Sequence, residues 1–344
     1  MGVQILNFVS ASFSYVFRDS LMDSGDNDYL LTLSTADSTP YGIDFKPSGG
    51  QPTGRFTDGR SIADIVGPAL REESFPPPFL APNSREHATS RGINYASGAL
   101  GILDETGSLF VSPISILINR ATYSQFDIVN YILKSSVYSL TIGSNDIINY
   151  ILPSVPYLSA QKLLPTITKV FMISNLTLQL KRLRDMGARK LVLVGIGLVG
   201  CIPFVRALNL FLPGGSCVIQ VNQFIQGYNK KLKELLDELN REGSREAIFV
   251  YVNSYDILME IVLNYRRHGF ENADALCRGG FFPPFDCYNA TSVMCDDRSK
   301  YMFWDAYRPT EAANAVVAQE LLDGDQTRSY PINIRQLYTY HFPS

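Results

Sequence analysis

The sequence predicts an α/β protein built on a doubly wound, mostly parallel sheet. Short apolar runs typical of strands occur at 14–17, 136–142, 189–195 and 247–253. Long amphipathic stretches lie between these runs, and parallel strands need crossover connections of such length. In open parallel sheets, sites form at the carboxyl ends of the strands. Polar residues follow the strands at 18–28, 143–146 and 195–200, so we expect the site there.

Three helices stand out in the pattern. The clearest is predicted over 218–241, where apolar residues recur on one stripe. A second is predicted over 161–187, ending at a glycine. A third is predicted to open at Pro309, because proline favours the first helical position, and to continue through "TEAANAVVAQELL". No internal repeat or domain-length linker is evident, so residues 14–344 are expected to form one domain.

Composition excludes several classes of function. The formal net charge is −3 and no long basic run occurs, which argues against a nucleic-acid partner. The longest apolar stretch, "KLVLVGIGLVGCIPFV", is too short and too interrupted by glycine for a membrane span. None of the five cysteines forms a CxxC pair, so a zinc site is not expected. No other metal and no cofactor is expected either. The oligomeric state stays open.

The cellular route is indicated by weaker signals. Sequons occur at Asn175 and Asn289, and the cysteines near the second favour a secretory route with disulfides. Residues 1–13 are moderately apolar without a basic start, so they fit either a degenerate signal segment or a lead-in to the first strand.

Two motifs invite interpretations that their context opposes. "GIGLVG" at 195–200 matches a dinucleotide fingerprint, but Pro203 follows at once and no acidic residue stands about twenty positions on. A glycine-rich turn is therefore predicted. The aspartates between 19 and 28 lack the glycine and distal glutamate of a calcium loop. They are predicted to form a solvated turn in which Asp and Asn side chains bond nearby amides.

Three polar positions suggest nucleophilic catalysis. Ser20 lies just past a strand, where a nucleophile would stand at the mouth of the sheet. Asn145 follows another strand and could direct an amide donor at a developing oxyanion. Asp305 stands three residues before Arg308, near the start of the last predicted helix.

At this point the chain resembles a known family. "FRDSLMDSGDNDYL", "YGIDF", "PTGRFTDGR", "GINYASGALGILDETG", "IGSND", "WDAYRPTEAAN" and "PINIRQL" follow the order of plant GDSL esterase/lipases, of the SGNH hydrolase superfamily. The resemblance runs from about residue 14 to 338. It implies a flavodoxin-like, three-layer α/β/α domain that is secreted, glycosylated and hydrolyses small-molecule carboxylic esters or lipids.

The resemblance also implies roles for individual residues. Ser20 matches the nucleophile, and Asp305 matches the acid of an Asp-x-x-His pattern. The backbone amides of Ser20 and Gly98 and the side chain of Asn145 match the oxyanion hole, with Gly98 preferred over Gly101.

The chain departs from that pattern at the site. Arg18 stands where the family has glycine, and Arg308 stands where it has the base histidine. A serine hydroxyl needs a base poised near neutral pH, whereas arginine stays protonated. None of the three histidines, His87, His268 and His341, falls at a matching position, so each is predicted to be a surface residue. We therefore expect a hydrolase with low catalytic activity or none.

The alternative is a non-catalytic binding protein on the esterase fold. Its pocket would then suit an anion such as a carboxylate or phosphate, because arginines cluster there. The cysteines depart as well, since Leu276 replaces one of an adjacent pair in the family. Cys201 with Cys217 is the natural nearby pair, and one thiol among Cys277, Cys287 and Cys295 is left over.

Overall fold

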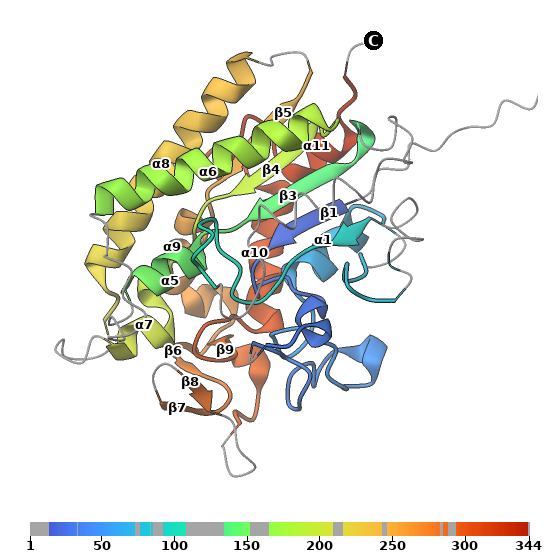
Figure 1. Cartoon of the computed structure of the whole chain (residues 1–344). Coiled ribbons are helices and arrows are strands. Elements are labelled where there is room, and N and C mark those ends of the chain that lie inside the picture. The colour runs from blue at the N-terminus through green and yellow to red at the C-terminus, as the bar shows by residue number, and fades with distance from the viewer. Residues whose placement is uncertain are drawn as a thin grey trace, which may run out of the picture.

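The computed structural model describes most of the chain, and its central element is a six-stranded sheet (Figure 1). The described residues are 14–32, 34–72, 76–82, 84, 92–107, 134–151, 165–208, 216–242, 246–282, 285–287 and 294–342. The candidate signal segment at 1–13 lies outside them. The strands are β1 (Ser14–Arg18), β2 (Ile93–Asn94), β3 (Val137–Thr141), β4 (Lys190–Val194), β5 (Ile248–Val252) and β10 (Ser329–Tyr330).

The sheet is mostly parallel, as the sequence predicts. Its strand order is β2-β1-β3-β4-β5-β10, and only β10 runs antiparallel, against β5. The first five strands follow the order of flavodoxin-like sheets, whose ligand site lies at the switch point between β1 and β3. The predicted flavodoxin-like, doubly wound architecture is therefore confirmed.

Helices cover both faces of the sheet, and the alternation of strand side chains decides which face meets which helix. Tyr15 and Phe17 of β1 point to one face, toward α6 (Pro165–Asp185) and α8 (Ile219–Glu242). Val16 points to the other. That second layer comprises α1 (Ile62–Ala69), α9 (Ser254–Leu263), α10 (Glu311–Asp323) and α11 (Ile334–Thr339). Figure 1 shows α6 lying across the strands and α8 passing it at the side of the sheet. The three-layer α/β/α arrangement is confirmed.

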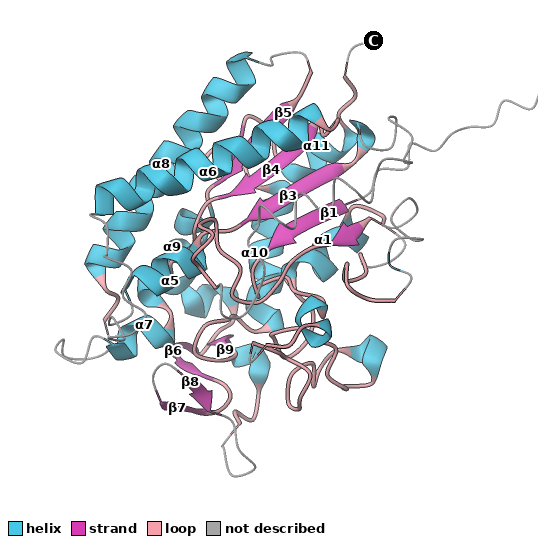
Figure 2. Cartoon of the chain, viewed as in Figure 1, coloured by secondary structure: helices cyan, strands magenta, loops and turns pink. Residues whose placement is uncertain are grey.

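Smaller elements gather beyond the carboxyl ends of the main strands. They are α5 (Ser144–Ile151), α7 (Pro203–Leu208), the parallel pair β6 (Asn272–Leu276) with β9 (Tyr301–Phe303), and the hairpin β7 (Gly280–Phe282) with β8 (Phe285–Cys287). Figure 2 shows both small sheets on the side to which the arrowheads of β1 and β3 point. Short 3₁₀ turns occur at 26–29, 46–48, 199–201, 265–268 and 298–300.

All three predicted helices are present, and the start of the third differs from the prediction. Helix α8 lies within one residue of the predicted 218–241, and α6 falls inside the predicted 161–187, of which 161–164 lie outside the described residues. The prediction that a helix opens at Pro309 is wrong. Thr310 is the N-cap of α10, its Oγ1 accepting the Ala313 amide, and Pro309 pairs in extended conformation with Phe303. A threonine hydroxyl satisfies an orphan helix amide, which sets the boundary.

The glycine-rich run at 195–200 is a turn, as predicted. Asn229 Oδ1 accepts the Ile196 amide and Asn229 Nδ2 donates to the Ile196 carbonyl, both at 2.8 Å. Asn222 Oδ1 accepts the Gly200 amide at 3.0 Å. Side chains of α8 thus occupy the polar groups of this turn.

Two disulfides close loops of the chain. Cys201 pairs with Cys217, which confirms that prediction, and Cys277 pairs with Cys295. Among the helices that the structure describes, none is both long and apolar enough to cross a membrane.

Candidate active site

A cavity of about 1170 Å³ opens at the carboxyl ends of β1, β3 and β4. It exceeds the roughly 300–1,000 Å³ typical of small-molecule pockets. Ser20, Asn145 and Arg308 all line it, although they are far apart in the sequence. The topology explains their meeting in part, because Ser20 follows β1, Asn145 follows β3, and these strands are neighbours.

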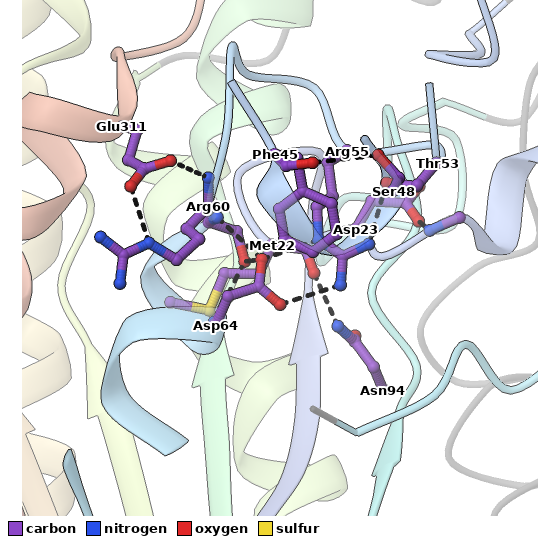
Figure 3. A network of polar contacts seen from close by, with 12 residues as sticks. Met22, Asp23, Phe45, Ser48, Thr53, Arg55, Arg60, Asp64, Asn94 and Glu311 are labelled. Carbon is purple, nitrogen blue, oxygen red and sulfur yellow. Dashed lines mark hydrogen bonds and ion pairs between the residues drawn. The ribbon is translucent and has the colours of Figure 1, made fainter. Parts of the chain in front are cut away.

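The turn that carries Ser20 is fixed by its neighbours. The Arg18 carbonyl accepts the Ser97 amide at 2.9 Å, and Asp19 Oδ1 accepts the Leu21 amide at 3.1 Å. Asn94 Nδ2 donates to the Met22 carbonyl at 2.7 Å, a contact visible in Figure 3. These bonds hold Ser20 half-buried at the cavity wall.

The loop that follows is fixed by two ion pairs, also drawn in Figure 3. Arg55 forms a buried, bidentate pair with Asp64 of α1, with Nε–Oδ2 at 2.7 Å and Nη2–Oδ1 at 2.9 Å. Arg60 binds Glu311 at the start of α10, with Nε–Oε1 at 2.7 Å. The loop is thereby fastened to two helices of the second layer.

Arg308 connects the serine to the buried carboxylate. Its Nε donates to Ser20 Oγ at 3.1 Å, and its Nη1 donates to Asp305 Oδ2 at 2.9 Å. The guanidinium also lies 4.3 Å from the centre of the Phe56 ring, a cation–π contact. Arg308 therefore fills the space between Ser20 and Asp305 where a base would have to stand, and presents only donors there.

Asp305 is a positioned anion. It is fully buried, and its Oδ1 accepts the backbone amides of Tyr307 and Arg308 at 2.8 and 2.7 Å. Its Oδ2 accepts the Tyr41 hydroxyl at 3.2 Å as well as the Arg308 guanidinium. These donors satisfy both carboxylate oxygens and fix the direction of the side chain toward Arg308.

The predicted oxyanion donors differ in their placement. Asn145 lines the cavity, and its Nδ2 donates to the Leu100 carbonyl at 2.9 Å. The Gly98 amide donates to Asp23 Oδ2 at 3.0 Å and to Asn27 Oδ1 at 3.1 Å. The next residue, Ala99, lines the cavity and has a φ of 69°. The structure thus gives the Gly98 amide other acceptors, and its oxyanion role stays a prediction.

Asp19, Asp23 and Asp26 of the acidic turn are buried, which corrects the prediction of a solvated turn, whereas Asp28 is exposed as predicted. Asp23 is fully buried, and its Oδ1 accepts the amides of Gly25 and Asp26, both at 2.8 Å. Burial raises the pKa of Asp23 to about 7. Asp26 Oδ1 accepts the Leu80 amide at 2.7 Å. Bonding to nearby amides was predicted correctly, but local sequence does not show that segments 76–82 and 92–107 pack over the turn.

Asp146 supports the site without lining the cavity, a role that the sequence analysis did not assign. Its Oδ2 accepts the Ile102 amide at 2.8 Å, and its Oδ1 accepts the Leu103 amide and the Thr106 hydroxyl at 2.9 and 2.8 Å. Burial raises the pKa of Asp146 to about 6. It ties the loop that carries Ala99 to the first turn of α5, which carries Asn145. Its place directly after Asn145 was the available signal.

Three arginines line the cavity. Arg18 is 2% exposed, and Arg278 lies over the Tyr41 ring at 4.0 Å from its centre. Arg308 is the third. Among the described residues, no aspartate or glutamate lines the cavity. Arg278 was not singled out from the sequence, because nothing local marks it.

The histidines that the structure describes provide no base at this site. His268 is bonded through Nε2 to Glu260 Oε2 at 2.8 Å, and His341 is exposed. Neither lines the cavity. His87 lies outside the described residues.

Comparison with known proteins identifies the family. The model of the GDSL-like lipase/acylhydrolase family matches residues 15–321. The chain belongs to this family.

Plant relatives agree over nearly the whole chain. GDSL esterase/lipase At5g41890 of Arabidopsis thaliana is 52% identical over 350 aligned residues, covering 96% of this chain and 95% of the relative. GDSL esterase/lipase At3g50400 of the same plant is 46% identical, covering 94% of this chain and 90% of the relative. GDSL esterase/lipase 7 is 37% identical, covering 94% and 91%. Family membership supports lipid ester hydrolysis as the general chemistry of the fold, with small-molecule esters or lipids as substrates.

Proposed function

We propose that this GDSL-family protein hydrolyses esters very slowly or not at all, and acts by binding an ester or lipid-derived ligand in its cavity. One observation carries the proposal. The group that connects Ser20 to Asp305 is the guanidinium of Arg308, donating to Ser20 Oγ at 3.1 Å and to Asp305 Oδ2 at 2.9 Å.

The direction of the hydrogen bond supports this proposal. In a serine hydrolase, the residue between nucleophile and acid takes the hydroxyl proton and later gives it to the leaving group. A guanidinium has no acceptor and stays cationic near neutral pH, so it can do neither. Its positive charge favours an ionised serine oxygen, but the proton still needs an acceptor. General acid–base catalysis contributes about 10²–10⁴-fold, and that part is missing here.

The rest of the site is suited to retaining a ligand. Arg308 is held by the ion pair to Asp305 and the contact with Phe56, so its side chain cannot swing out without losing both. The cavity behind it remains open and is lined largely by apolar side chains.

The test restores the base that the resemblance implies. Arg308→His should raise kcat/KM for p-nitrophenyl butyrate by about 10²–10⁴-fold, because the imidazole of that variant would lie between a buried carboxylate and the serine. Adding Arg18→Gly also removes the second departure from the family pattern. Ser20→Ala, in both the wild-type and the Arg308→His backgrounds, gives the rate that does not depend on the nucleophile.

Two results would reject the proposal. One is a wild-type turnover far above that of Ser20→Ala, together with covalent labelling by a phosphonate at the rate of an ordinary serine hydrolase. The other is the absence of any gain in both Arg308→His and the double variant, provided that each folds by circular dichroism.

We further propose that the protein is secreted and glycosylated. The two disulfides support an oxidising compartment. Asn175 lies half-buried on α6, and Asn289 lies outside the described residues. Mass spectrometry of the protein recovered from the medium of expressing plant cells tests both points, and recovery only from cell lysate without glycan contradicts them.

A further inference from the structure

The most buried charged side chain on the cavity wall is that of Arg18. It is 2% exposed, and its Nε has no hydrogen-bond partner. Among the residues that the structure describes, no carboxylate lies within 4 Å of its guanidinium. The adjacent Asp19 directs Oδ1 to the Leu21 amide instead. The charge of Asp19 attracts Arg18 without direct contact between the two side chains. A cation taken out of water without an ion pair is costly, so its place on a cavity wall points to a ligand that supplies one.

A second unpartnered polar atom stands beside it. Thr141 of β3 is the register partner of Arg18 across the β1–β3 pair, so both side chains project from the same face of the sheet. Thr141 is 7% exposed, and its Oγ1 has no hydrogen-bond partner. Both residues line the large cavity. Directly opposite residues on paired strands lie close enough for one small group to contact both.

The charge of the wall selects an anion. Arg278 and Arg308 line the same cavity as Arg18, and among the described residues no acidic side chain does. Arg308 forms an ion pair with Asp305, whereas Arg18 forms none with any described residue, although the charge of the adjacent Asp19 attracts it. A cavity lined by one sign of charge within low-dielectric walls concentrates the opposite charge.

The apolar side chains around Arg18 favour a ligand that has a hydrocarbon part as well as an anionic group. Ile62, Val194 and Leu321 line the large cavity with Arg18, and the same residues also border a second cavity of about 40 Å³ that Arg18 touches. The wall continues through apolar side chains, including Met302 and Val317. The anionic group therefore has to be followed by a hydrocarbon chain.

We propose that Arg18 and Thr141 bind the carboxylate of a long-chain fatty acid whose hydrocarbon chain lies along the apolar wall of the cavity. A guanidinium and one hydroxyl supply donors for two oxygens that share a single negative charge. A phosphate dianion would bring a second charge into an apolar setting. This inference rests on the proposed function, because it assumes that the protein binds a lipid-derived ligand in its cavity.

The experiment compares ligands that differ only in the head group. Wild-type protein is titrated with cis-parinaric acid by fluorescence, and the probe is displaced with palmitate, hexadecanol or hexadecyl phosphate. Palmitate should bind at least tenfold more tightly than hexadecanol, because hydrogen bonds to a buried charge are strong. Affinity should rise about fourfold for each methylene added to the fatty acid, until the cavity is filled.

Variants assign the effect to the proposed pair. Arg18→Met should lower palmitate affinity by about 10–100-fold and leave hexadecanol affinity unchanged. Thr141→Val, which keeps the shape of the side chain, should lower palmitate affinity by about fivefold. Arg278→Met removes a cation from the same cavity and serves as the matched control, with a smaller effect than Arg18→Met. Arg18→Lys keeps a charge and should retain part of the palmitate preference.

Each outcome decides the matter. Equal affinity of the wild type for palmitate and hexadecanol overturns the inference, as does an unchanged palmitate preference in Arg18→Met. Tighter binding of hexadecyl phosphate than of palmitate overturns the assignment to a carboxylate. If Arg18→Met fails to fold, a palmitate preference in Thr141→Val equal to that of the wild type overturns it.

The binding assay does not involve ester turnover. A failure here therefore leaves the proposal for Arg308 standing, and fast hydrolysis by the wild type would reject that proposal without affecting the palmitate result.

Discussion

The absence of an ion pair at Arg18 among the described residues predicts an unusual stability change, and a second buried arginine provides the comparison. Arg18→Met should stabilise the ligand-free protein, while Arg55→Met should destabilise it. Both arginines are buried, at 2% and 7% exposure, but only Arg55 forms an ion pair with a described carboxylate, that of Asp64 at 2.7 Å, whereas Arg18 is attracted by Asp19 without contact. Removing an unpaired buried charge relieves a desolvation cost, whereas removing one member of a buried pair leaves the other uncompensated.

The magnitude follows from the structure. Burial lowers the pKa of Arg18 from 12.5 to about 9, which at about 1.4 kcal/mol per pH unit corresponds to roughly 5 kcal/mol. The shorter methionine leaves some space unfilled, so a net gain of about 1–4 kcal/mol is expected. At about 2 °C per kcal/mol for a protein of this size, Tm should rise by about 2–8 °C. Arg55→Met should cost about 3–5 kcal/mol.

The pH dependence provides an internal check. Because the folded-state pKa of Arg18 is lowered, the unfolded chain binds more protons above about pH 9, and wild-type stability rises there relative to the variant. The advantage of Arg18→Met should be complete below pH 9 and shrink above it. Urea unfolding monitored by circular dichroism, at pH 7 and pH 10, measures both differences. A loss of stability in Arg18→Met comparable to that of Arg55→Met would refute the reasoning.

Two further predictions concern other parts of the fold. Burial raises the pKa of Glu72 to about 7, so the contribution of Glu72 to stability is complete below about pH 4.5 and is lost as the pH rises through 7. Glu72→Gln should therefore reduce the change in the free energy of unfolding between pH 5 and pH 8 by about 2–3 kcal/mol, and an unchanged pH dependence would contradict this. Cys217→Ser opens the disulfide to Cys201, which spans a sequence separation of 16, and should lower the free energy of unfolding by about 3 kcal/mol, whereas an unchanged urea midpoint would show that the bridge contributes nothing.

Much of the fold could be predicted because its determinants are local or periodic. The four strands that were predicted coincide with β1, β3, β4 and β5 to within a residue or two, since short apolar runs between long amphipathic helices leave few alternatives. Ser20 and Asn145 could be placed at one edge because parallel strands end on the same side of a sheet. Asp305 and Arg308 are close in sequence, so their ion pair is a local contact.

Only the tertiary structure decided how those polar groups are partnered. The Gly98 amide meets Asp23 across a sequence separation of 75, and the acidic turn is buried by segments that its own sequence does not specify. Arg18 and Thr141 become neighbours through strand register, and their burial depends on helices packed over that face. Patterns along the chain fix which residues face a core. Whether a buried polar atom has a hydrogen-bond partner depends on chain segments that are far apart in the sequence and meet only in the folded protein. In this protein that packing leaves Arg18 on the cavity wall without an ion pair to any described residue.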